Sequence, residues 1–160
     1  MIFVTVGEQL PFDRLIRAID EWGGTSKKEF FAQIGRANYT PKHISFKAFL
    51  TPEEFKGKFM AAEVIVAHAG MGTIISALEF NKPIIVMPRQ AELGEHRSNH
   101  QFSTAKRFLE LNYITVAFNE AELKAKLENI AELLYNVKRL QAIGPSPLLI
   151  KTIRDFIEVK

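Results

Sequence analysis

Residues 64–73 read VIVAHAGMGT, and this stretch carries the clearest structural signal in the chain. Its first four residues, Val64–Ala67, are all apolar and predict a short strand. Gly70 and Gly72 then mark a tight turn into a helix that begins near Thr73. Strands that are apolar on consecutive residues are typical of parallel sheets covered by helices on both faces. The stretch therefore predicts an α/β fold.

The same pattern recurs on both sides of this stretch. Further apolar runs predict strands at Ile2–Val6, Glu29–Ile34, Ile44–Phe49, Ile84–Met87 and Tyr113–Phe118. Helix spacing of apolar residues lies between the strands, in the ranges 12–19, 55–62 and 123–137. Thr51 and Asn119 are each followed three residues later by an acid, which predicts N-terminal helix caps. The alternation predicts a Rossmann-like, doubly wound parallel sheet of about six strands.

Length and composition indicate one ordinary globular domain. The chain has 160 residues, of which 47% are hydrophobic and 24% charged, and it contains no cysteine. We expect a single domain over 1–160, with a last helix over 146–160 that either closes the domain or docks on a partner. No run approaches the ~20 apolar residues of a membrane span, so we expect neither an anchor nor a signal peptide. The lack of cysteine makes the cytoplasm the expected compartment.

The charge of the chain excludes little. The formal net charge is +3, and lysine and arginine are scattered among acids instead of clustered. Such a pattern does not imply nucleic-acid binding. A weak positive field would suit a diphosphate ligand or an anionic membrane surface, but a plain solvated surface explains it equally.

Ligands in open α/β sheets bind beyond the carboxyl ends of the strands. Three segments follow predicted strands in this way: Gly7–Gln9, His68–Thr73 and Pro88–Gln101. The third segment reads PRQAELGEHRSNHQ, a long polar connection where most loops have ~4–6 residues. Long loops at this edge are often functional, although surface loops are also polar simply because they are wet.

Gly70 and Gly72 predict an anion site. Without side chains at this turn, backbone N–H groups approach a ligand closely, and the helix dipole and the Thr73 hydroxyl add to the attraction. A diphosphate would fit there, although glycines at such turns also serve simply to form the turn. A G-x-G-x-x-G fingerprint after the first strand is missing, which disfavours a dinucleotide site of the NAD type.

Several of these fragments occur together in one known family. They are FVTVG at Phe3–Gly7, FD at Phe12–Asp13, HAGMGT at His68–Thr73, KP at Lys82–Pro83, PR at Pro88–Arg89, GEH at Gly94–His96 and NHQ at Asn99–Gln101. In combination they resemble the C-terminal domain of family 28 glycosyltransferases, over Met1 to about Leu111. The chain is similar in particular to small donor-binding subunits of two-component bacterial capsule and exopolysaccharide transferases.

This resemblance implies a half-domain of the GT-B architecture that binds the UDP part of a donor sugar. It implies a hexosyltransferase that moves a sugar from a UDP-sugar to a lipid-linked polysaccharide or glycan acceptor. The partner implied is a membrane-associated, acceptor-binding subunit, which would hold this cytoplasmic chain at the inner face of the membrane. UDP-sugar is the substrate, and no cofactor or essential metal is implied.

The resemblance also transfers site residues to matching positions. The expected donor-binding residues are Gly7, His68, Gly70, Met71, Gly72, Thr73, Glu79, Arg89, Glu95, Asn99 and Gln101. His96 and His100 are candidate catalytic bases, because an imidazole has an ordinary pKa of about 6.5. In inverting relatives the base generally comes from the acceptor side, so the partner is the other candidate source. Backbone around Phe49 and Leu50 falls where relatives hold the uracil ring.

Two positions depart from the family pattern. Ser76 stands where relatives often have a glutamate that binds the ribose hydroxyls. Glu79 lies one helical turn further on and would replace that glutamate only if the helix were rotated or shifted. Glu8 stands where relatives often have threonine, and an acid there would repel a phosphate unless it has another purpose. The preference for UDP is therefore left open.

Two other interpretations remain. His68, His96 and His100 could form a zinc site if His96 and His100 shared a helix face, but the H-E-x-x-H pattern is absent. A non-catalytic nucleotide-sugar sensor of the same fold is the alternative to an enzyme, and Ser76 is the reason to consider it. Self-association is left open.

Overall fold

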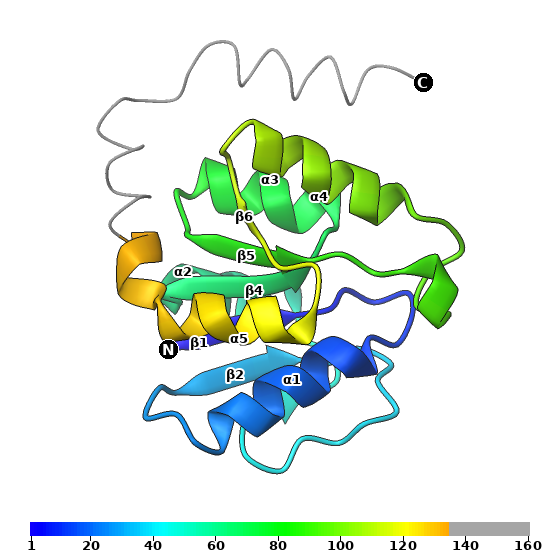
Figure 1. The fold of residues 1–160 in the computed structure, drawn as a ribbon. Helices are drawn as coiled ribbons and strands as arrows, with labels where there is room; N and C mark the ends of the chain where they lie inside the picture. The colour runs from blue at the N-terminus through cyan, green and yellow to red at the C-terminus, as the bar shows by residue number, and fades with distance from the viewer. Residues whose placement is uncertain (135–160) are drawn as a thin grey trace.

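The strands form one parallel sheet in the order β3-β2-β1-β4-β5-β6 in the computed structural model, which describes residues 1–134 (Figure 1). The strands are β1 at Ile2–Thr5, β2 at Phe30–Gln33, β3 at Ser45–Lys47, β4 at Val64–His68, β5 at Ile84–Met87 and β6 at Thr115–Val116. Each lies within or next to a predicted run, and the order is that of a Rossmann-like sheet, as predicted. The helix predicted over 146–160 lies outside the described residues.

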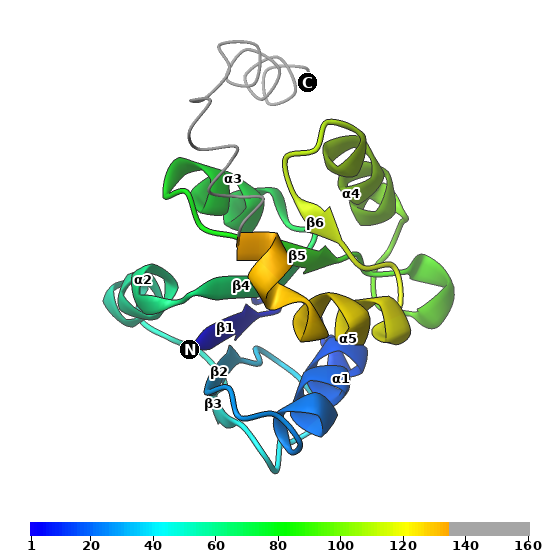
Figure 2. The ribbon, with the colours of Figure 1, turned by 60° about the vertical axis from the view of Figure 1, so that its left-hand side comes forward.

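Helices cover both faces of the sheet. They are α1 at Asp13–Gly23, α2 at Pro52–Ala61, α3 at Met71–Glu79, α4 at His100–Glu110 and α5 at Glu120–Glu128, with a short 3-10 turn, η1, at Ala91–Leu93. Figures 1 and 2 show α1 and α5 side by side on one face, while α2, α3 and α4 lie on the other. The sheet is therefore doubly wound.

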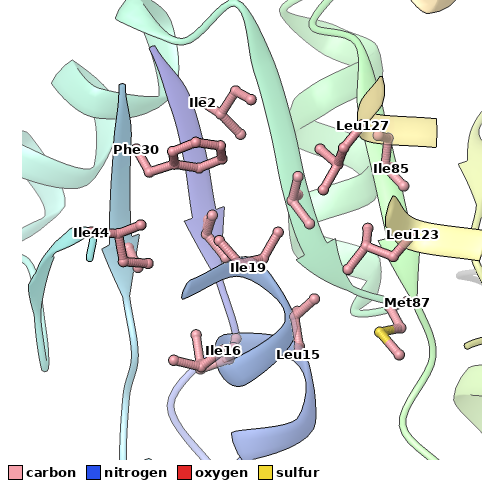
Figure 3. Packing of buried hydrophobic residues seen from close by; sticks show 14 of the residues in the cluster. Ile2, Leu15, Ile16, Ile19, Phe30, Ile44, Ile85, Met87, Leu123 and Leu127 are labelled. Carbon is pink, nitrogen blue, oxygen red and sulfur yellow. The ribbon is translucent and has the colours of Figure 1, made fainter. Parts of the chain in front are cut away.

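Alternate residues of β1, β2, β4 and β5 contribute to two separate apolar cores. Ile2 and Val4 of β1 face α1 and α5, where they pack with Ile16, Ile19 and Leu123 (Figure 3). Burying one such side chain stabilises the fold by at most about 1.5–3 kcal/mol. On the opposite face an aromatic group dominates, in which Phe3 contacts the rings of Phe31, Phe55 and Phe59.

The capping residues predicted from the sequence are confirmed. Thr51 forms a capping box at α2, because its hydroxyl accepts from the Glu54 N–H at 3.2 Å and the Glu54 carboxylate accepts from the Thr51 N–H at 2.9 Å. Asn119 accepts from the Glu122 N–H at 2.8 Å at the start of α5. These bonds satisfy amides that helical geometry leaves unpaired.

Some boundaries differ from the predictions. Helix α3 begins at Met71, two residues earlier than predicted. Helix α4 was not predicted at all, and it shortens the polar connection because His100 and Gln101 are already helical. The sixth strand is only Thr115–Val116 instead of the whole run from Tyr113 to Phe118.

The described helices are short. The longest, α1 and α4, have 11 residues each and extend ~17 Å. Within residues 1–134, no helix has both the length and the apolar character needed to cross a bilayer.

Candidate functional site

The topology singles out one position on the carboxyl edge of the sheet. From β1 the chain proceeds outward to β2 and β3, and then returns to place β4 on the other side of β1. Helix α1, which follows β1, covers one face, whereas α3, which follows β4, covers the other. Ligands of doubly wound sheets bind at such a switch point. Here it lies between the turns that contain Gly7 and Gly70.

Glycines allow the turns after β1, β2 and β4 to come into close contact. A Cβ on Gly35 would lie 2.5 Å from the Gly7 carbonyl oxygen, and both residues have positive φ, 58° and 73°. A Cβ on Gly70 would lie 2.2 Å from Nε2 of His68, and one on Gly7 would lie 2.9 Å from Cε1 of the same ring. His68 is thus packed between two glycines, which explains why side chains are excluded at both positions.

The first turn of α3 has free backbone amides. Its N-cap is Gly70, which has no side chain to bond them, and the first helical bond runs from Ile74 N–H to the Gly70 carbonyl at 3.1 Å. The N–H groups of Met71, Gly72 and Thr73 come before that bond and have no helical partner. A Cβ built on Gly72 meets no atom within 4 Å, so the surface is open there. Unlike the capped starts of α2 and α5, this one is suited to an anion.

His68 supplies a neutral side chain beside this turn. Burial, reinforced by the charge of Arg89, lowers the pKa of His68 to about 4, although the nearby backbone of Thr5 slightly favours the protonated ring. Its buried Nδ1 has no hydrogen-bond partner. At neutral pH the ring is therefore uncharged.

Arg89 is buried, and both of its terminal nitrogens, Nη1 and Nη2, donate to backbone carbonyls. It is 2% exposed and donates to the carbonyls of Val6 at 2.8 Å, Leu10 at 2.7 Å and Pro11, and to that of Glu95 at 3.3 Å. Burial lowers the pKa of Arg89 to about 10, with Glu95 opposing the change. The side chain fastens the β1–α1 loop to the end of β5, and its role in donor binding stays a prediction.

Glu95 is engaged in the same way. Its carboxylate accepts from Arg14 Nε at 2.6 Å and Nη2 at 2.8 Å, and from the Gln90 N–H at 2.9 Å. Arg14 also donates to the Pro88 carbonyl at 3.2 Å. This bidentate pair joins α1 to the loop after β5, so Glu95 also positions a loop.

Asn99 and Gln101 hold the loop after β5 to itself. Asn99 accepts from the Ala91 N–H at 2.9 Å and donates to Glu92 at 2.6 Å. Gln101 is 5% exposed, and its Oε1 accepts from the Arg89 N–H at 3.2 Å. Both lie at the start of α4, which is why the segment is ordered.

His96 and His100 lie together but not on one helix. His96 precedes α4, whereas His100 is its first residue, so the shared helix face on which the zinc interpretation rested is wrong. Their ring centroids are 4.4 Å apart, and both Nδ1 atoms contact Ser98. Partial burial, with His100 and Arg89 nearby, lowers the pKa of His96. Among residues 1–134, no group of three or more His, Cys, Asp or Glu is placed to hold a metal ion.

Four further positions lie elsewhere. Glu79 is exposed at the last residue of α3, ~12 Å along the helix from its start, so it is not beside the amides. Ser76 is half-buried in the middle of α3. Phe49 is 48% exposed beyond the end of β3, and Glu8 is exposed beside Gly7.

One polar residue at this edge was missed from the sequence. Gln33 ends β2, pairs in register with Thr5 of β1, and is 3% exposed. Its signal was present, because it is an amide at the end of the otherwise apolar run EFFAQI.

Comparisons with known proteins agree with this geometry. The sequence profile of the glycosyltransferase family 28 C-terminal domain matches residues 1–142. The human UDP-N-acetylglucosamine transferase subunit ALG13 is 29% identical over 117 residues, which cover 66% of this chain and 10% of the human protein. The calicheamicin glycosyltransferase CalG4 has a TM-score of 0.63 at 16% identity, over 98% of this chain and 44% of its own. A solution structure of ALG13 has a TM-score of 0.55 at 21% identity, and the match covers 80% of this chain and 83% of the ALG13 chain.

The chain is a Rossmann-like half-domain of the kind found in GT-B glycosyltransferases. More particularly, it belongs to the glycosyltransferase family 28 C-terminal domain family. It spans about a tenth of the length of the human relative. That relative is eukaryotic, and the similarity to small bacterial subunits stays a prediction.

Proposed function

We propose that this chain is the donor-binding subunit of a hexosyltransferase that uses a UDP-sugar. The observation that carries the proposal is the uncapped start of α3 at Gly70–Thr73, placed at the switch point of the sheet. Membership of the family and the name of the human relative, a UDP-N-acetylglucosamine transferase subunit, support the choice of reaction and donor.

In this proposal the backbone of the chain holds the diphosphate. The N–H groups of Met71, Gly72 and Thr73 donate to phosphate oxygens, and the dipole of α3 stabilises the negative charge that grows on the leaving diphosphate. Each such interaction at an exposed helix end contributes about 0.3–1 kcal/mol. The mechanism uses no metal or other cofactor.

The acceptor side belongs to a partner in this proposal. A membrane-associated subunit binds a lipid-linked acceptor and holds this chain at the cytoplasmic face of the membrane. The acceptor hydroxyl loses its proton to a base of that partner, with His96 and His100 as the candidate bases within this chain. The lowered pKa of His96 keeps its ring neutral at neutral pH, so a ring nitrogen is free to accept a proton, although the same shift makes the ring a weaker base.

Calorimetric titration of the full chain tests donor binding. We expect UDP and a UDP-hexose to bind with micromolar to millimolar affinity, and inorganic pyrophosphate to bind more weakly. The affinity of pyrophosphate compared with that of UDP gives the share of binding that the diphosphate contributes. If no nucleotide binds at millimolar concentration, the proposal is wrong.

A sensor without transfer activity is the second candidate. The observation that favours it is that Arg89, Glu95 and Gln101, all expected to contact the donor, instead bond to the protein itself. Co-expression with a partner subunit, followed by a transfer assay with radiolabelled UDP-sugar, separates the two functions. Transfer supports the enzyme, whereas binding without transfer in the presence of the partner supports the sensor.

A further inference from the structure

Buried polar atoms without a hydrogen bond are rare in folded proteins, and each calls for an explanation. In residues 1–134 there are two such side-chain atoms, Nδ1 of His68 and Oε1 of Gln33. Leaving a buried amide oxygen unpaired costs about 1–3 kcal/mol. Both residues end strands that flank β1, so the unpaired atoms lie at the edge where the proposed ligand binds.

Other buried polar side chains of this protein show what a structural role looks like. The Asp20 carboxylate accepts from Tyr39 Oη at 2.7 Å and from the N–H groups of Lys42 and His43 at 2.9 and 2.7 Å. Gln101 is as buried as Gln33, and it accepts from the Arg89 N–H. A purely structural glutamine at position 33 would show similar bonds.

The register of the sheet fixes where Gln33 lies. Thr5, Gln33 and Lys47 are paired across β1, β2 and β3 at the carboxyl edge. Because side chains alternate along a strand, Gln33 shares the face of Phe31, which packs in the core covered by α2 and α3. Lys47 is occupied by Glu54 of α2 at 2.7 Å.

The position relative to α3 suits one part of a nucleotide. Strand β2 is two places from β4 in the sheet, and strands lie about 4.8 Å apart, so Gln33 is roughly 10 Å from the end of β4. A ligand whose diphosphate lies at the start of α3 would extend its nucleoside over this distance. Gln33 and α3 lie on the same face, so the nucleoside would extend across that face of the sheet.

We propose that the carboxamide of Gln33 hydrogen-bonds the nucleoside part of the donor. The inference rests on the proposed function, since it needs a diphosphate at α3. An uncharged amide, with one acceptor and two donors, matches the ribose hydroxyls or a base edge, whereas it cannot neutralise a phosphate. Without ligand the amide oxygen is unpaired and costs stability, and the bound nucleoside supplies the missing donor.

The test replaces Gln33 by methionine in the full chain, which keeps the length of the side chain and removes its polar atoms. Titration with UDP should show affinity about tenfold weaker than the unaltered chain, the loss expected for one buried hydrogen bond. Affinity for inorganic pyrophosphate should not change. Thermal unfolding should be unchanged or shifted upward, because the unpaired amide is gone.

Gln101→Met is the matched control for stability. It removes an amide that is already bonded, so its unfolding temperature should fall where that of Gln33→Met does not. If Gln33→Met lowers the unfolding temperature equally, the amide has a structural role and the inference is wrong. A second variant, Gln33→Leu, serves in the same comparison if the methionine variant does not fold.

The ligands separate this inference from the proposed function. If Gln33→Met binds UDP as tightly as the unaltered chain, the inference is wrong and the proposed function still holds. The same conclusion follows if the variant loses affinity equally for UDP and for pyrophosphate. If the unaltered chain binds neither ligand, both are wrong. 2′-Deoxy-UDP identifies the contact. If the variant loses the preference for UDP over 2′-deoxy-UDP, the amide binds the 2′-hydroxyl of the ribose, and if it keeps that preference, the amide binds the 3′-hydroxyl or the base.

Discussion

Two segments of the carboxyl edge contrast in how they use polar groups. The loop from Pro88 to Gln101 is rich in charged and amide side chains, and those of Arg89, Glu95 and Gln101 bond to the protein. The turn at Gly70–Thr73 has almost no polar side chains, yet the amides at its helix start have no side-chain cap. In the proposed function, binding capacity therefore lies where groups are left unpaired, and a high density of polar residues does not by itself indicate it.

The two segments depend on each other. Arg89 holds the carbonyls of Val6, Leu10 and Pro11, which keeps the β1–α1 loop and Gly7 in place beside His68 and Gly70. The polar loop thus builds the frame, and the glycine turn presents the amides. Pre-organised donors bind and stabilise charge better than donors that must first be ordered.

Arg89→Met should have the largest effect, because it removes the side chain that connects the polar loop to the β1–α1 loop. We expect the free energy of unfolding to fall by about 3 kcal/mol or more, because the buried carbonyl of Val6 and the partly buried carbonyls of Leu10 and Pro11 lose their donor. Urea denaturation followed by circular dichroism measures the change. If Arg89 instead bound the donor directly, stability would be kept and only UDP affinity would fall.

Lys106→Met is the control for Arg89→Met. Lys106 is exposed on α4, so its replacement should change stability by less than about 0.5 kcal/mol. Equal effects of the two variants would contradict the role assigned to Arg89.

Gly72→Asp should have the next largest effect, and on binding alone. A carboxylate in the first turn of α3 repels the diphosphate, and we expect UDP affinity to fall about a hundredfold, or ~2.7 kcal/mol. The added Cβ meets no atom within 4 Å, and an acid favours a helix start, so stability should be unchanged or slightly higher. Calorimetry and thermal unfolding measure the two quantities.

Gly72→Asn separates charge from shape. It has the size of aspartate without the charge and should keep most of the UDP affinity. If both variants lose affinity equally, steric blocking is the cause, and if neither does, the diphosphate does not bind at α3.

The sheet was predictable because burial on both faces leaves a direct record in the sequence. Runs such as Val64–Ala67 contain no polar residue and are therefore easy to recognise as buried strands. Their alternation with helical segments determines the fold class. Helix α4 left no such record. Its buried residues include Gln101 and Thr104 as well as Ala105 and Phe108, so the apolar period is incomplete.

The position of the site was also predictable, but the roles of its side chains were not. Gly70 and Gly72 follow a strand, and that alone places the turn at the carboxyl edge. Whether Arg89 faces a ligand or the protein depends on partners up to 83 residues away in sequence. No local pattern records such a contact, and the same holds for the unpaired amide of Gln33.

His68 gives a pH-dependent test of the turn itself. Its pKa is about 4 in the folded chain, below the ordinary value of 6.5, so the unfolded chain takes up this proton at higher pH. Stability from the neutral ring is complete above about pH 6.5 and is lost as pH falls toward 4. When the pH is lowered from 7.5 to 5.0, we expect the free energy of unfolding to fall by about 1–2 kcal/mol more in the unaltered chain than in His68→Asn.

Urea denaturation of both proteins at the two pH values gives this difference directly. Other titrating groups contribute equally to both proteins and cancel in the comparison. Parallel pH profiles would mean that the ring is not held neutral between Gly7 and Gly70.

The smallest effect is expected at Glu8, which is exposed and lies next to Gly7 in the loop after β1. Its carboxylate opposes a diphosphate at the neighbouring turn through solvent, so Glu8→Gln should raise UDP affinity about twofold, or ~0.4 kcal/mol. The gain should disappear in 1 M salt, where charges are screened within about 3 Å. Glu21→Gln is the control, because α1 runs back from the carboxyl edge and places Glu21 at the opposite edge. The electrostatic explanation is wrong if the gain in UDP affinity persists in 1 M salt, or if Glu21→Gln shows the same gain.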